Sequence, residues 1–214
     1  TKRLNGIQQN RSMKISVITV AYNSASTIED TLRSIASQSH PDIEHVIVDG
    51  ASTDDTLAII ARQPRKPGQL ISEPDNGIYD AMNKGIMACN GDIVGFLNSD
   101  DVFADDDALE NIAQVFDDPD VDACYGDLVY VSKDNRAVVR YWRSVPFSKG
   151  KFAKGWCPPH PTFYVRRTIM EQLGLFDTDF RLAADAEFLM RYLEVGGIKV
   201  KYLPMVLVRM RVGG

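Results

Sequence analysis

The sequence predicts an α/β fold class: a single Rossmann-like domain with a mostly parallel central sheet and a small antiparallel extension. Three observations predict it. Short apolar, β-rich runs alternate with segments of helical periodicity from residue 13 to residue 101. A strand of alternating polarity and a turn follow in the second half. The chain has 214 residues and 44% hydrophobic content, enough for one substantial core but not for two.

The first half consists of repeated strand–helix units. Residues 15–21 are apolar and β-rich, and apolar residues then recur at helical spacing over residues 28–36. A second strand over residues 44–49 leads into a helix around residues 57–60. This alternation implies parallel pairing and right-handed crossovers. The remaining units are a strand at 69–72, a helix at 78–88 and a strand at 93–97.

The second half has a different pattern. A helix over residues 107–116 leads to an alternating strand at 122–131, which turns back antiparallel into residues 137–142. Residues 149–161 are rich in Gly, Pro and aromatic residues without a period, which indicates a functional loop. The last predicted elements are helices at 167–173 and 185–194, a strand at 198–203 and an edge strand at 205–208.

Composition excludes several classes of protein. The net charge is −5 and the basic residues are scattered, so we expect no nucleic-acid partner. Cys89, Cys124 and Cys157 have no paired metal spacing and are expected to be reduced thiols of a cytoplasmic protein. No window reaches the roughly 18 apolar residues of a membrane span. Residues 1–12 are polar and aperiodic, and we expect a disordered leader or an expression remnant there.

The most informative stretch is 96–101, where an apolar run ends in two adjacent carboxylates. Asp100 and Asp101 should emerge at the carboxyl end of a buried strand, the edge where open α/β sheets bind ligands. Two hard oxygen ligands suit Mg²⁺ or Mn²⁺, and such an ion suits a diphosphate. The alternative is that the pair caps the next helix.

Asp49 should reach the same edge, at the end of the second strand. There its carboxylate can accept the ring N–H of a pyrimidine or guanine, or it can simply form the turn before Gly50. Asp75 lies in a polar turn, where it would approach a sugar or nucleotide or act as a turn or helix cap. Lys84, within a helix, could reach a phosphate as a point charge or lie on the surface.

Four segments carry a resemblance to a known family. SVITVAYN, VDGASTD, GIYDAMNKG and NSDD resemble the nucleotide-sugar-binding half of the family 2 inverting glycosyltransferases, which have the GT-A fold. Residues 174–177 and 183–188 resemble the acceptor-side motif. The match covers nearly the whole chain after residue 13, in the right order. It implies that 13–101 is the nucleotide-sugar-binding half and 102–214 the acceptor-binding half of one domain.

The resemblance assigns roles at the donor side. It implies that Tyr22 covers the base, although a tyrosine there could equally be plain packing. It also implies that one of Asp100 and Asp101 contacts the ribose and the other the metal, and it does not assign which residue has which role. Asn98 stands where the family usually has the first Asp of an Asp-x-Asp motif, which removes one charge from the ligand set. The acidic residues 105–107 are expected to form the first turn of a helix.

Asp185 is the candidate general base. An inverting transfer needs a carboxylate that takes the proton of an acceptor hydroxyl as the oxygen attacks the anomeric carbon opposite the diphosphate. The family often has Glu-Asp here, whereas Ala184 precedes Asp185 in this chain. The alternative is a helix N-cap. Glu187 would serve acceptor binding or the helix start.

The proline-rich loop supplies two further candidates. His160 could bind the metal or the diphosphate, or donate a proton to the departing phosphate, unless it is merely structural. Trp156 could stack on an acceptor sugar ring or anchor the loop.

The sequence therefore predicts a metal-dependent inverting glycosyltransferase that uses a nucleotide-diphosphate sugar and a saccharide or lipid-linked acceptor in surface polysaccharide or glycoconjugate biosynthesis. The alternatives are a non-catalytic nucleotide-sugar-binding domain and a sugar nucleotidyltransferase, which should have a glycine-rich basic loop that residues 21–27 lack. We expect a cytoplasmic protein with weak, salt-sensitive attraction to anionic lipid at the inner membrane face. The basic residues expected to provide it are Lys199, Lys201, Arg209 and Arg211.

Overall fold

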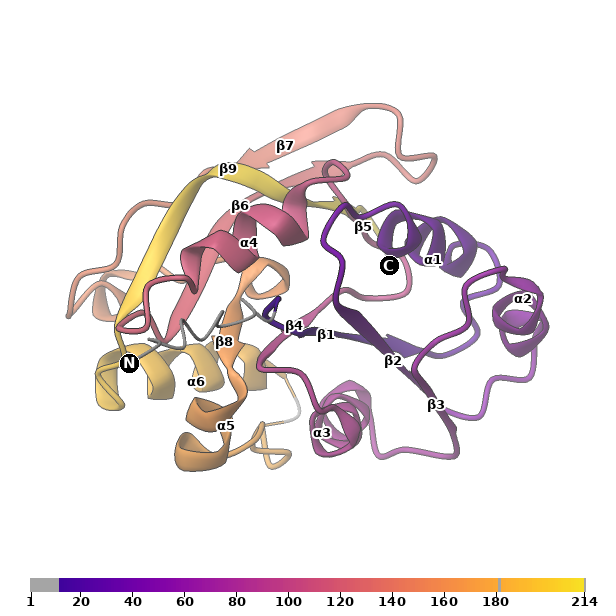
Figure 1. Ribbon diagram of the computed structural model, residues 1–214, viewed down its shortest axis with the longest axis horizontal. Helices are drawn as coiled ribbons and strands as arrows, with labels where there is room; N and C mark the ends of the chain where they lie inside the picture. The colour runs from indigo at the N-terminus through magenta and orange to yellow at the C-terminus, as the bar shows by residue number, and fades with distance from the viewer. Residues whose placement is uncertain (1–11, 181, 214) are drawn as a thin grey trace, which may run out of the picture.

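Nine strands form one curved sheet in the computed structural model, which describes residues 12–180 and 182–213 (Figure 1). The strand order is β3-β2-β1-β4-β8-β6-β9-β5, with β7 paired to β6 outside this path. The strands are β1 (Ile15–Ala21), β2 (Ile43–Asp49), β3 (Gln69–Ser72), β4 (Ile93–Phe96), β5 (Val102–Phe103), β6 (Ala123–Val131), β7 (Val138–Trp142), β8 (Tyr164–Arg166) and β9 (Val200–Arg211). The α-helices are α1 (Ile28–Ala36), α2 (Thr56–Arg62), α3 (Ile78–Ala88), α4 (Ala108–Val115), α5 (Arg167–Leu173) and α6 (Ala184–Met190). The predicted leader lies, apart from residue 12, outside the described residues.

The strands β1, β2, β3 and β4 pair in parallel, as their alternation with helices predicts. The register sets Ala21 opposite Asp49 and Asp49 opposite Ser72, while Ile18 pairs with Phe96. The carboxyl ends of β1, β2, β3 and β4 therefore lie at one edge of the sheet. The residues that follow these strands meet there.

Helices cover both faces of the sheet because the side chains of each strand alternate between the faces. Ile18 and Val20 of β1 join a core cluster with α3, α5 and α6, whereas Ile15 and Val17 join a second cluster with α4. In Figure 1, α3, α5 and α6 lie below β1 and β4, and α1 and α4 lie above these two strands.

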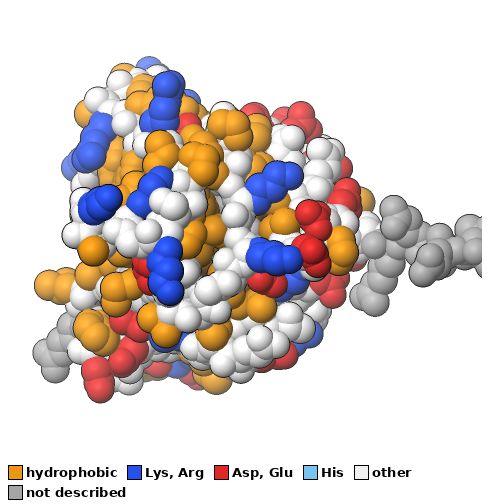
Figure 2. All heavy atoms as spheres, turned by 90° about the vertical axis from the view of Figure 1, so that its left-hand side faces the viewer, with side chains coloured by type: hydrophobic (Ala, Val, Ile, Leu, Met, Phe, Trp, Pro, Cys, Tyr) orange, Lys and Arg blue, Asp and Glu red, His pale blue; other side chains and the backbone are white. Residues whose placement is uncertain are grey.

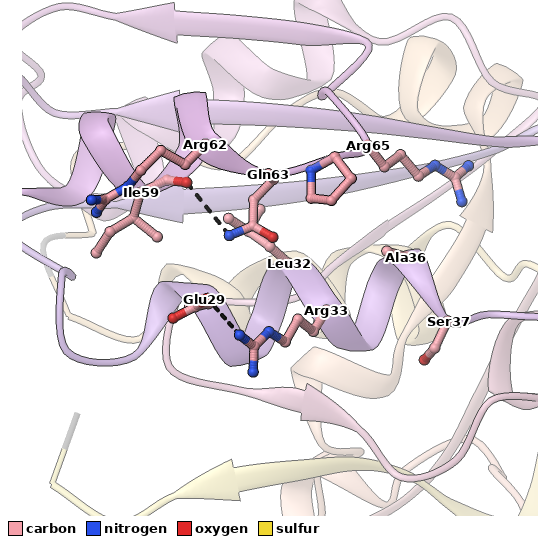
Figure 3. Close-up of a pocket in the computed structure, with 10 residues that line it drawn as sticks. Glu29, Leu32, Arg33, Ala36, Ser37, Ile59, Arg62, Gln63 and Arg65 are labelled. Carbon is pink, nitrogen blue, oxygen red and sulfur yellow. Dashed lines mark hydrogen bonds and ion pairs between the residues drawn. The ribbon is translucent and has the colours of Figure 1, made fainter.

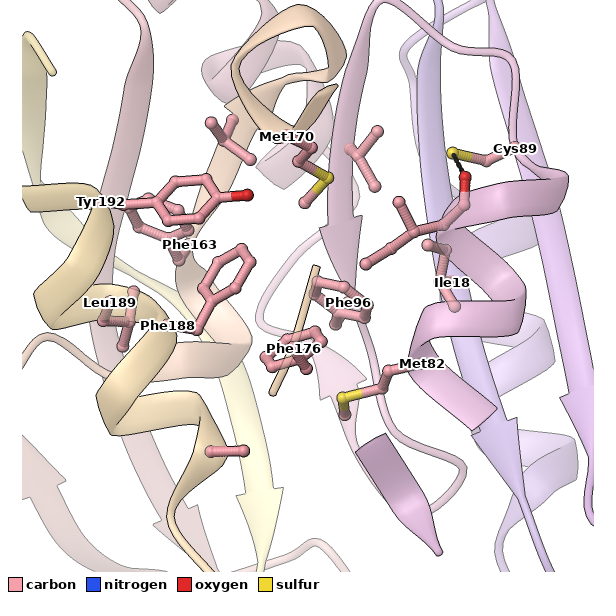
Figure 4. Packing of buried hydrophobic residues seen from close by; sticks show 14 of the residues in the cluster. Ile18, Met82, Cys89, Phe96, Phe163, Met170, Phe176, Phe188, Leu189 and Tyr192 are labelled. Carbon is pink, nitrogen blue, oxygen red and sulfur yellow. Dashed lines mark hydrogen bonds between the residues drawn. The ribbon is translucent and has the colours of Figure 1, made fainter. Parts of the chain in front are cut away.

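Aromatic side chains dominate the first cluster and dock α6 against the sheet (Figure 4). Phe176 stacks on Phe188 with ring centroids 4.4 Å apart, and its edge meets Phe96 of β4 at 5.5 Å. Phe188 also stacks on Tyr192 at 4.0 Å. Full burial of each such side chain contributes roughly 1.5–3 kcal/mol, so this contact fixes where the start of α6 stands.

The second half departs from the predicted elements in several places. The β6–β7 hairpin is antiparallel, as predicted. The short strands β5 and β8 were not predicted, and β8 lies between β4 and β6, antiparallel to both. The predicted strands at 198–203 and 205–208 form the single strand β9, which runs parallel to β6 with two register shifts.

Three further boundaries differ. The run 205–208 is not an edge, because β5 pairs with β9 through Phe103 and Val208. The predicted helix at 185–194 is α6 followed by a π-helical turn, Arg191–Val195. The loop at 149–161 contains two 3₁₀ turns, Phe152–Lys154 and His160–Thr162.

Two of the four basic residues expected to attract lipid, Arg209 and Arg211, are held by other residues of the fold. Arg211 is buried and paired with Asp30, and Arg209 donates hydrogen bonds to Asn135. Lys199 pairs with Asp120 at 3.0 Å. On the left-hand side of Figure 1, Lys and Arg are dispersed among hydrophobic side chains (Figure 2). Within residues 12–180 and 182–213, no helix combines the length and apolarity needed to cross a bilayer.

The β4–β8 contact depends on a glycine. A Cβ atom at Gly95 would lie 2.2 Å from Cε1 of the buried Tyr164 ring, a separation that real structures do not tolerate. We expect Gly95→Ala to lower the free energy of unfolding by about 1–3 kcal/mol, the usual cost of overpacking. Urea denaturation measures it. Gly68→Ala is the matched control, since its Cβ would meet Glu44 at 3.4 Å on an exposed turn. Equal midpoints for both variants would contradict this account.

Candidate active site

A pocket of about 810 Å³ opens at the carboxyl edge of the parallel strands. Residues following β1 and β4 form two of its walls, and the turn before α3 forms a third. The end of β9 closes it from the other half of the chain. Of the predicted site residues, this pocket brings together Tyr22, Asp75, Asp100 and Asp101.

Tyr22 and Asp75 meet over Gly50. A Cβ atom at Gly50 would lie 2.4 Å from Oδ2 of Asp75 and 3.5 Å from Cδ2 of Tyr22, so only a glycine fits between them. The Tyr22 side chain is 67% exposed, which excludes the plain-packing interpretation. Its ring is available to cover a flat ligand. Asp75 also accepts the backbone N–H of Gly77 at 2.9 Å, so it caps its own turn while its other oxygen faces Gly50.

Asp49 lies at the floor of this edge and is fully buried. Its Oδ2 accepts hydrogen bonds from the backbone N–H of Ser52 at 3.0 Å and from the Ser72 hydroxyl at 2.8 Å. Its Oδ1 is buried without a partner in the described structure. Because buried acceptors are normally satisfied, this oxygen is suited to a donor on a ligand. Oδ2 of Asp49 therefore holds the turn, as one of the two interpretations predicts, whereas Oδ1 has no partner among the described residues.

The turn after β4 holds a second buried acid. The backbone N–H of Asp101 bonds to the Asn98 carbonyl at 3.1 Å, and the Thr31 hydroxyl donates to the Asp101 carbonyl at 2.7 Å. Oδ1 of Asp101 accepts the backbone N–H of Arg211 at 3.2 Å. Its Oδ2 and Oδ1 of Asn98 are buried without partners in the described residues.

Burial and the charge of Asp100 raise the pKa of Asp101 to about 8. Burial also raises the pKa of Asp100. Ionisation of Asp100 and Asp101 is unfavourable because both are removed from water and their charges repel, and a bound cation would offset this cost. Neither carboxylate caps the following helix, because the N-cap of α4 is Asp107.

These residues fit a divalent cation that also contacts a diphosphate. Mg²⁺ and Mn²⁺ are commonly held by one or two carboxylates together with substrate phosphates, rather than by a full cage of protein ligands. The described residues contain no cluster of three or more His, Cys, Asp or Glu that could hold a metal ion. The orphaned oxygens of Asp101 and Asn98 supply suitable hard ligands.

Lys84 does not line the pocket. Its ammonium donates to the Pro74 carbonyl at 2.8 Å and pairs with Glu73 at 2.8 Å and Asp80 at 3.7 Å. These partners hold it against the turn that carries Asp75. The contact of Lys84 with a phosphate stays a prediction, and in the described structure nearby acceptors engage its charge.

Asp185 is the second residue of α6, and its side chain contacts Tyr79 in the first turn of α3. Its Oδ1 accepts the hydroxyl of Tyr79 at 3.1 Å. The N-cap of α6 is Ala183, in the left-handed region at φ 65° and without a side-chain cap bond. Asp185 is therefore not the N-cap. Its carboxylate is held by a residue from α3, next to Ile78, which lines the pocket.

His160 is buried among aromatic rings rather than beside Asp100 and Asp101. Its ring centroid lies 5.2 Å from that of Phe96 and 5.5 Å from that of Phe176, and its Nε2 has no partner among the described residues. Burial lowers the pKa of His160 to about 4, although Asp185 opposes the shift. His160 therefore packs in the core, and its predicted contact with a metal or diphosphate stays a prediction.

The two predicted acceptor-side residues have structural partners. Trp156 packs against Phe147 and Phe152, with ring centroids 5.9 Å and 5.6 Å away, and anchors its loop. Glu187 forms a two-pronged ion pair with Arg191, at 2.7 Å and 3.0 Å. Arg191 in turn donates to the carbonyl of Leu175 at 2.7 Å, which ties α6 to the segment after α5.

The sequence did not reveal two residues at the site. Tyr79 lies within the GIYDAMNKG segment, but nothing local shows that its partner is 106 positions away. Arg211 was singled out only as a surface cation. Its guanidinium instead bonds to the Asp100 carbonyl at 3.1 Å and pairs with Asp30.

A separate hollow of about 780 Å³ lies between α1 and α2 (Figure 3). Leu32 and Ile59 form part of its lining, and Arg33, Arg62 and Arg65 surround it. Arg33 is paired with Glu29 at 2.6 Å. None of the predicted site residues lines it, so the strand-edge pocket is the candidate active site.

The chain is similar to known glycosyltransferases both in sequence and in structure. The chain is 30% identical over 195 residues to a PGL/p-HBAD biosynthesis glycosyltransferase of Mycobacterium bovis, covering 89% of this chain and 74% of that one. S. aureus TarS 1–349 in complex with UDP superposes with a TM-score of 0.72 and 26% identity, over 94% of this chain and 61% of the TarS 1–349 chain. The mannosyltransferase PcManGT of Pyrobaculum calidifontis, in complex with GDP-Man and Mn²⁺, has a TM-score of 0.71 and 26% identity over 92% of this chain and 57% of its own.

The chain thus spans about three-fifths of the solved structures it resembles. Residues 16–181 match the profile of glycosyl transferase family 2. With its GT-A fold, its strand-edge pocket and these relatives, the chain belongs to glycosyltransferase family 2.

Proposed function

We propose that this glycosyltransferase is metal-dependent and inverting, and that it moves a sugar from a nucleotide-diphosphate sugar to an acceptor hydroxyl. The observation that carries the proposal is the pair of buried, unpartnered carboxylate oxygens on Asp49 and Asp101, one at each end of the same strand edge. Asp49 would bind the base of the donor, and Asp101 would lie near its diphosphate. Complexes of similar proteins with UDP and with GDP-Man and Mn²⁺ support this class of ligand.

The donor would bind along the pocket from Asp49 towards Asp101. Oδ1 of Asp49 accepts a ring N–H of the base, and the exposed Tyr22 ring covers its face. Asp75, opposite Tyr22 across Gly50, contacts the ribose or the sugar. Asp100, less buried than Asp101, is placed for a ribose hydroxyl or a metal-bound water. The residues 13–101 would then form the donor half of the domain.

Asp101, with Asp100, would hold the divalent cation against the diphosphate. A bound cation there supplies Lewis-acid stabilisation of the charge that develops on the leaving group. The protein contributes a dry, fixed setting: the hydrogen bond from Arg211 holds Oδ1 of Asp101 so that Oδ2 points away from it.

Asp185 would act as the general base from the acceptor half, residues 102–214. As the acceptor oxygen forms its bond to the anomeric carbon, the bond to the diphosphate breaks on the opposite face. The acceptor proton passes to Asp185, and the configuration inverts. The acceptor is a saccharide or a lipid-linked saccharide, and a relative named for the biosynthesis of a glycoconjugate supports that class.

Divalent metal should strengthen nucleotide binding. We expect UDP or GDP to bind more tightly with Mn²⁺ or Mg²⁺ than with EDTA, because the ion links the diphosphate to Asp101. Asp101→Asn, which removes the charge at constant size, should abolish the difference, and the exposed control Asp117→Asn should retain it. Isothermal calorimetry measures both. Equal affinities with and without metal for the unaltered protein would reject metal dependence.

Removing the proposed base should affect turnover and not donor binding. Asp185→Asn should lower the rate of transfer by about 10²–10⁴, the usual contribution of a general base, while UDP or GDP affinity stays within about twofold. Transfer from a radiolabelled nucleotide sugar is the assay. Product of the inverted anomeric configuration, read by NMR, checks the stereochemistry. Near-normal transfer by this variant would place the base elsewhere.

We further propose that the enzyme works in the cytoplasm at the inner face of the membrane, where lipid-linked acceptors lie. The exposed Lys199 and Lys201 remain available for weak attraction to anionic lipid, although Asp120 partly neutralises Lys199. Co-sedimentation with anionic vesicles should therefore be detectable at low salt and lost at high salt. Failure to bind at low salt would contradict the membrane placement without touching the proposed chemistry.

A further inference from the structure

Tyr79 stands between the two halves of the proposed active site. It is the second residue of α3, directly after Ile78, which lines the donor pocket. Its hydroxyl donates to Oδ1 of Asp185 at 3.1 Å, across 106 residues of sequence. Among the described residues, this is the side chain that restrains the Asp185 carboxylate. The donor-side helix thus holds the proposed acceptor-side base directly.

The neighbours of Tyr79 keep its hydroxyl in place. Its ring packs on Phe176 with centroids 5.6 Å apart, and Phe176 is itself stacked on Phe188 of α6. One helical turn later, Asn83 forms a reciprocal pair of hydrogen bonds with the backbone of Phe176, each 2.9 Å long. Residues four apart share one face of a helix. One face of α3 therefore fixes both the segment before α6 and the carboxylate on α6.

The local structure of α6 makes such a restraint necessary. The helix begins after Ala183, in the left-handed region, and lacks a side-chain cap. Nothing within α6 itself holds the second residue in one rotamer. Productive proton transfer needs the base within hydrogen-bond reach of the acceptor hydroxyl, and small misplacements are costly.

On this geometry, and resting on the proposed function, we propose that Tyr79 is a positioning residue that holds the Asp185 carboxylate in the orientation for accepting the acceptor proton. Oδ1 is occupied by the Tyr79 hydroxyl, which leaves Oδ2 to face the acceptor. Tyr79 itself takes no proton from the substrate.

The test is a double-mutant cycle on transfer kinetics. Tyr79→Phe keeps the ring and its contact with Phe176 but removes the donor, and we expect kcat to fall about 10-fold, the factor for one hydrogen bond to a charged group. KM for the nucleotide sugar and the affinity for UDP or GDP should stay unchanged. In the Asp185→Asn background, the same substitution should cause no further loss of kcat, because residues that act as a unit are non-additive.

Tyr141→Phe is the matched control. It removes a hydrogen bond of the same kind, 2.9 Å from the Tyr141 hydroxyl to Asp127, between β7 and β6. Its kcat should equal that of the unaltered enzyme. Thermal melting of each variant checks that folding is retained.

The outcomes separate this inference from the proposed function. Wild-type kcat for Tyr79→Phe, together with loss of transfer for Asp185→Asn, overturns the role of Tyr79 and leaves the base in place. Equal losses from Tyr79→Phe in both backgrounds, or a rise in KM at constant kcat, also overturn it. Transfer retained by Asp185→Asn overturns the proposed base, and the inference fails with it.

Discussion

The parallel register of β1, β2, β3 and β4 is the constraint on which the rest of the structure depends. It places the last residues of each strand at one edge, so that Tyr22 and the turn from Asn98 to Asp101 line one pocket although they are far apart in the sequence. Asp49 lies at the end of the neighbouring strand β2. A slip of one residue in any pair would turn the strand over and send its apolar side chains to the wrong face. The two hydrophobic clusters therefore protect the pocket geometry as much as they stabilise the fold.

This arrangement buries the carboxylates of Asp100 and Asp101, which makes their ionisation unfavourable. Asp101 is fully buried beside Asp100, and its raised pKa reports that the folded chain without ligand tolerates the ionised form poorly. Because the pKa of Asp101 is higher in the folded chain than in the unfolded chain, ionisation of this carboxyl lowers the stability of the fold. The loss grows as the pH rises from the unfolded-state pKa towards 8. Such a group is poorly suited to stabilise a fold and well suited to bind a cation. The backbone N–H of Arg211 and its nearby guanidinium offset part of this cost.

The sequence predicted the strand–helix units of the first half because each repeats a local pattern with its own turn residues. It also predicted Tyr22, Asp75, Asp100 and Asp101 in the turns that follow strands, and these four residues line the pocket. What failed depended on distant partners. Nothing in Val102–Phe103 or Tyr164–Arg166 identifies a strand until β9 and β4 lie beside them. By contrast, the ion pairs of Lys84 with Asp80 and of Glu187 with Arg191 join residues four apart, a spacing that the sequence itself contains.

Backbone strain marks the same places. Asn23, Ala51, Asn135 and Ala183 adopt positive φ without being glycine. Three of them adjoin proposed site residues: Asn23 follows Tyr22, Ala51 follows the Asp49-Gly50 pair, and Ala183 precedes Asp185 by two positions. Asparagine tolerates this region, but each alanine costs of order 1 kcal/mol or more. Strain of this kind persists only where surrounding contacts over-determine the backbone. Next to Ala51, the backbone N–H of Ser52 donates to Oδ2 of Asp49 at 3.0 Å, and two residues after Ala183 the carboxylate of Asp185 accepts the Tyr79 hydroxyl at 3.1 Å, so hydrogen bonds hold the chain close to each strained alanine.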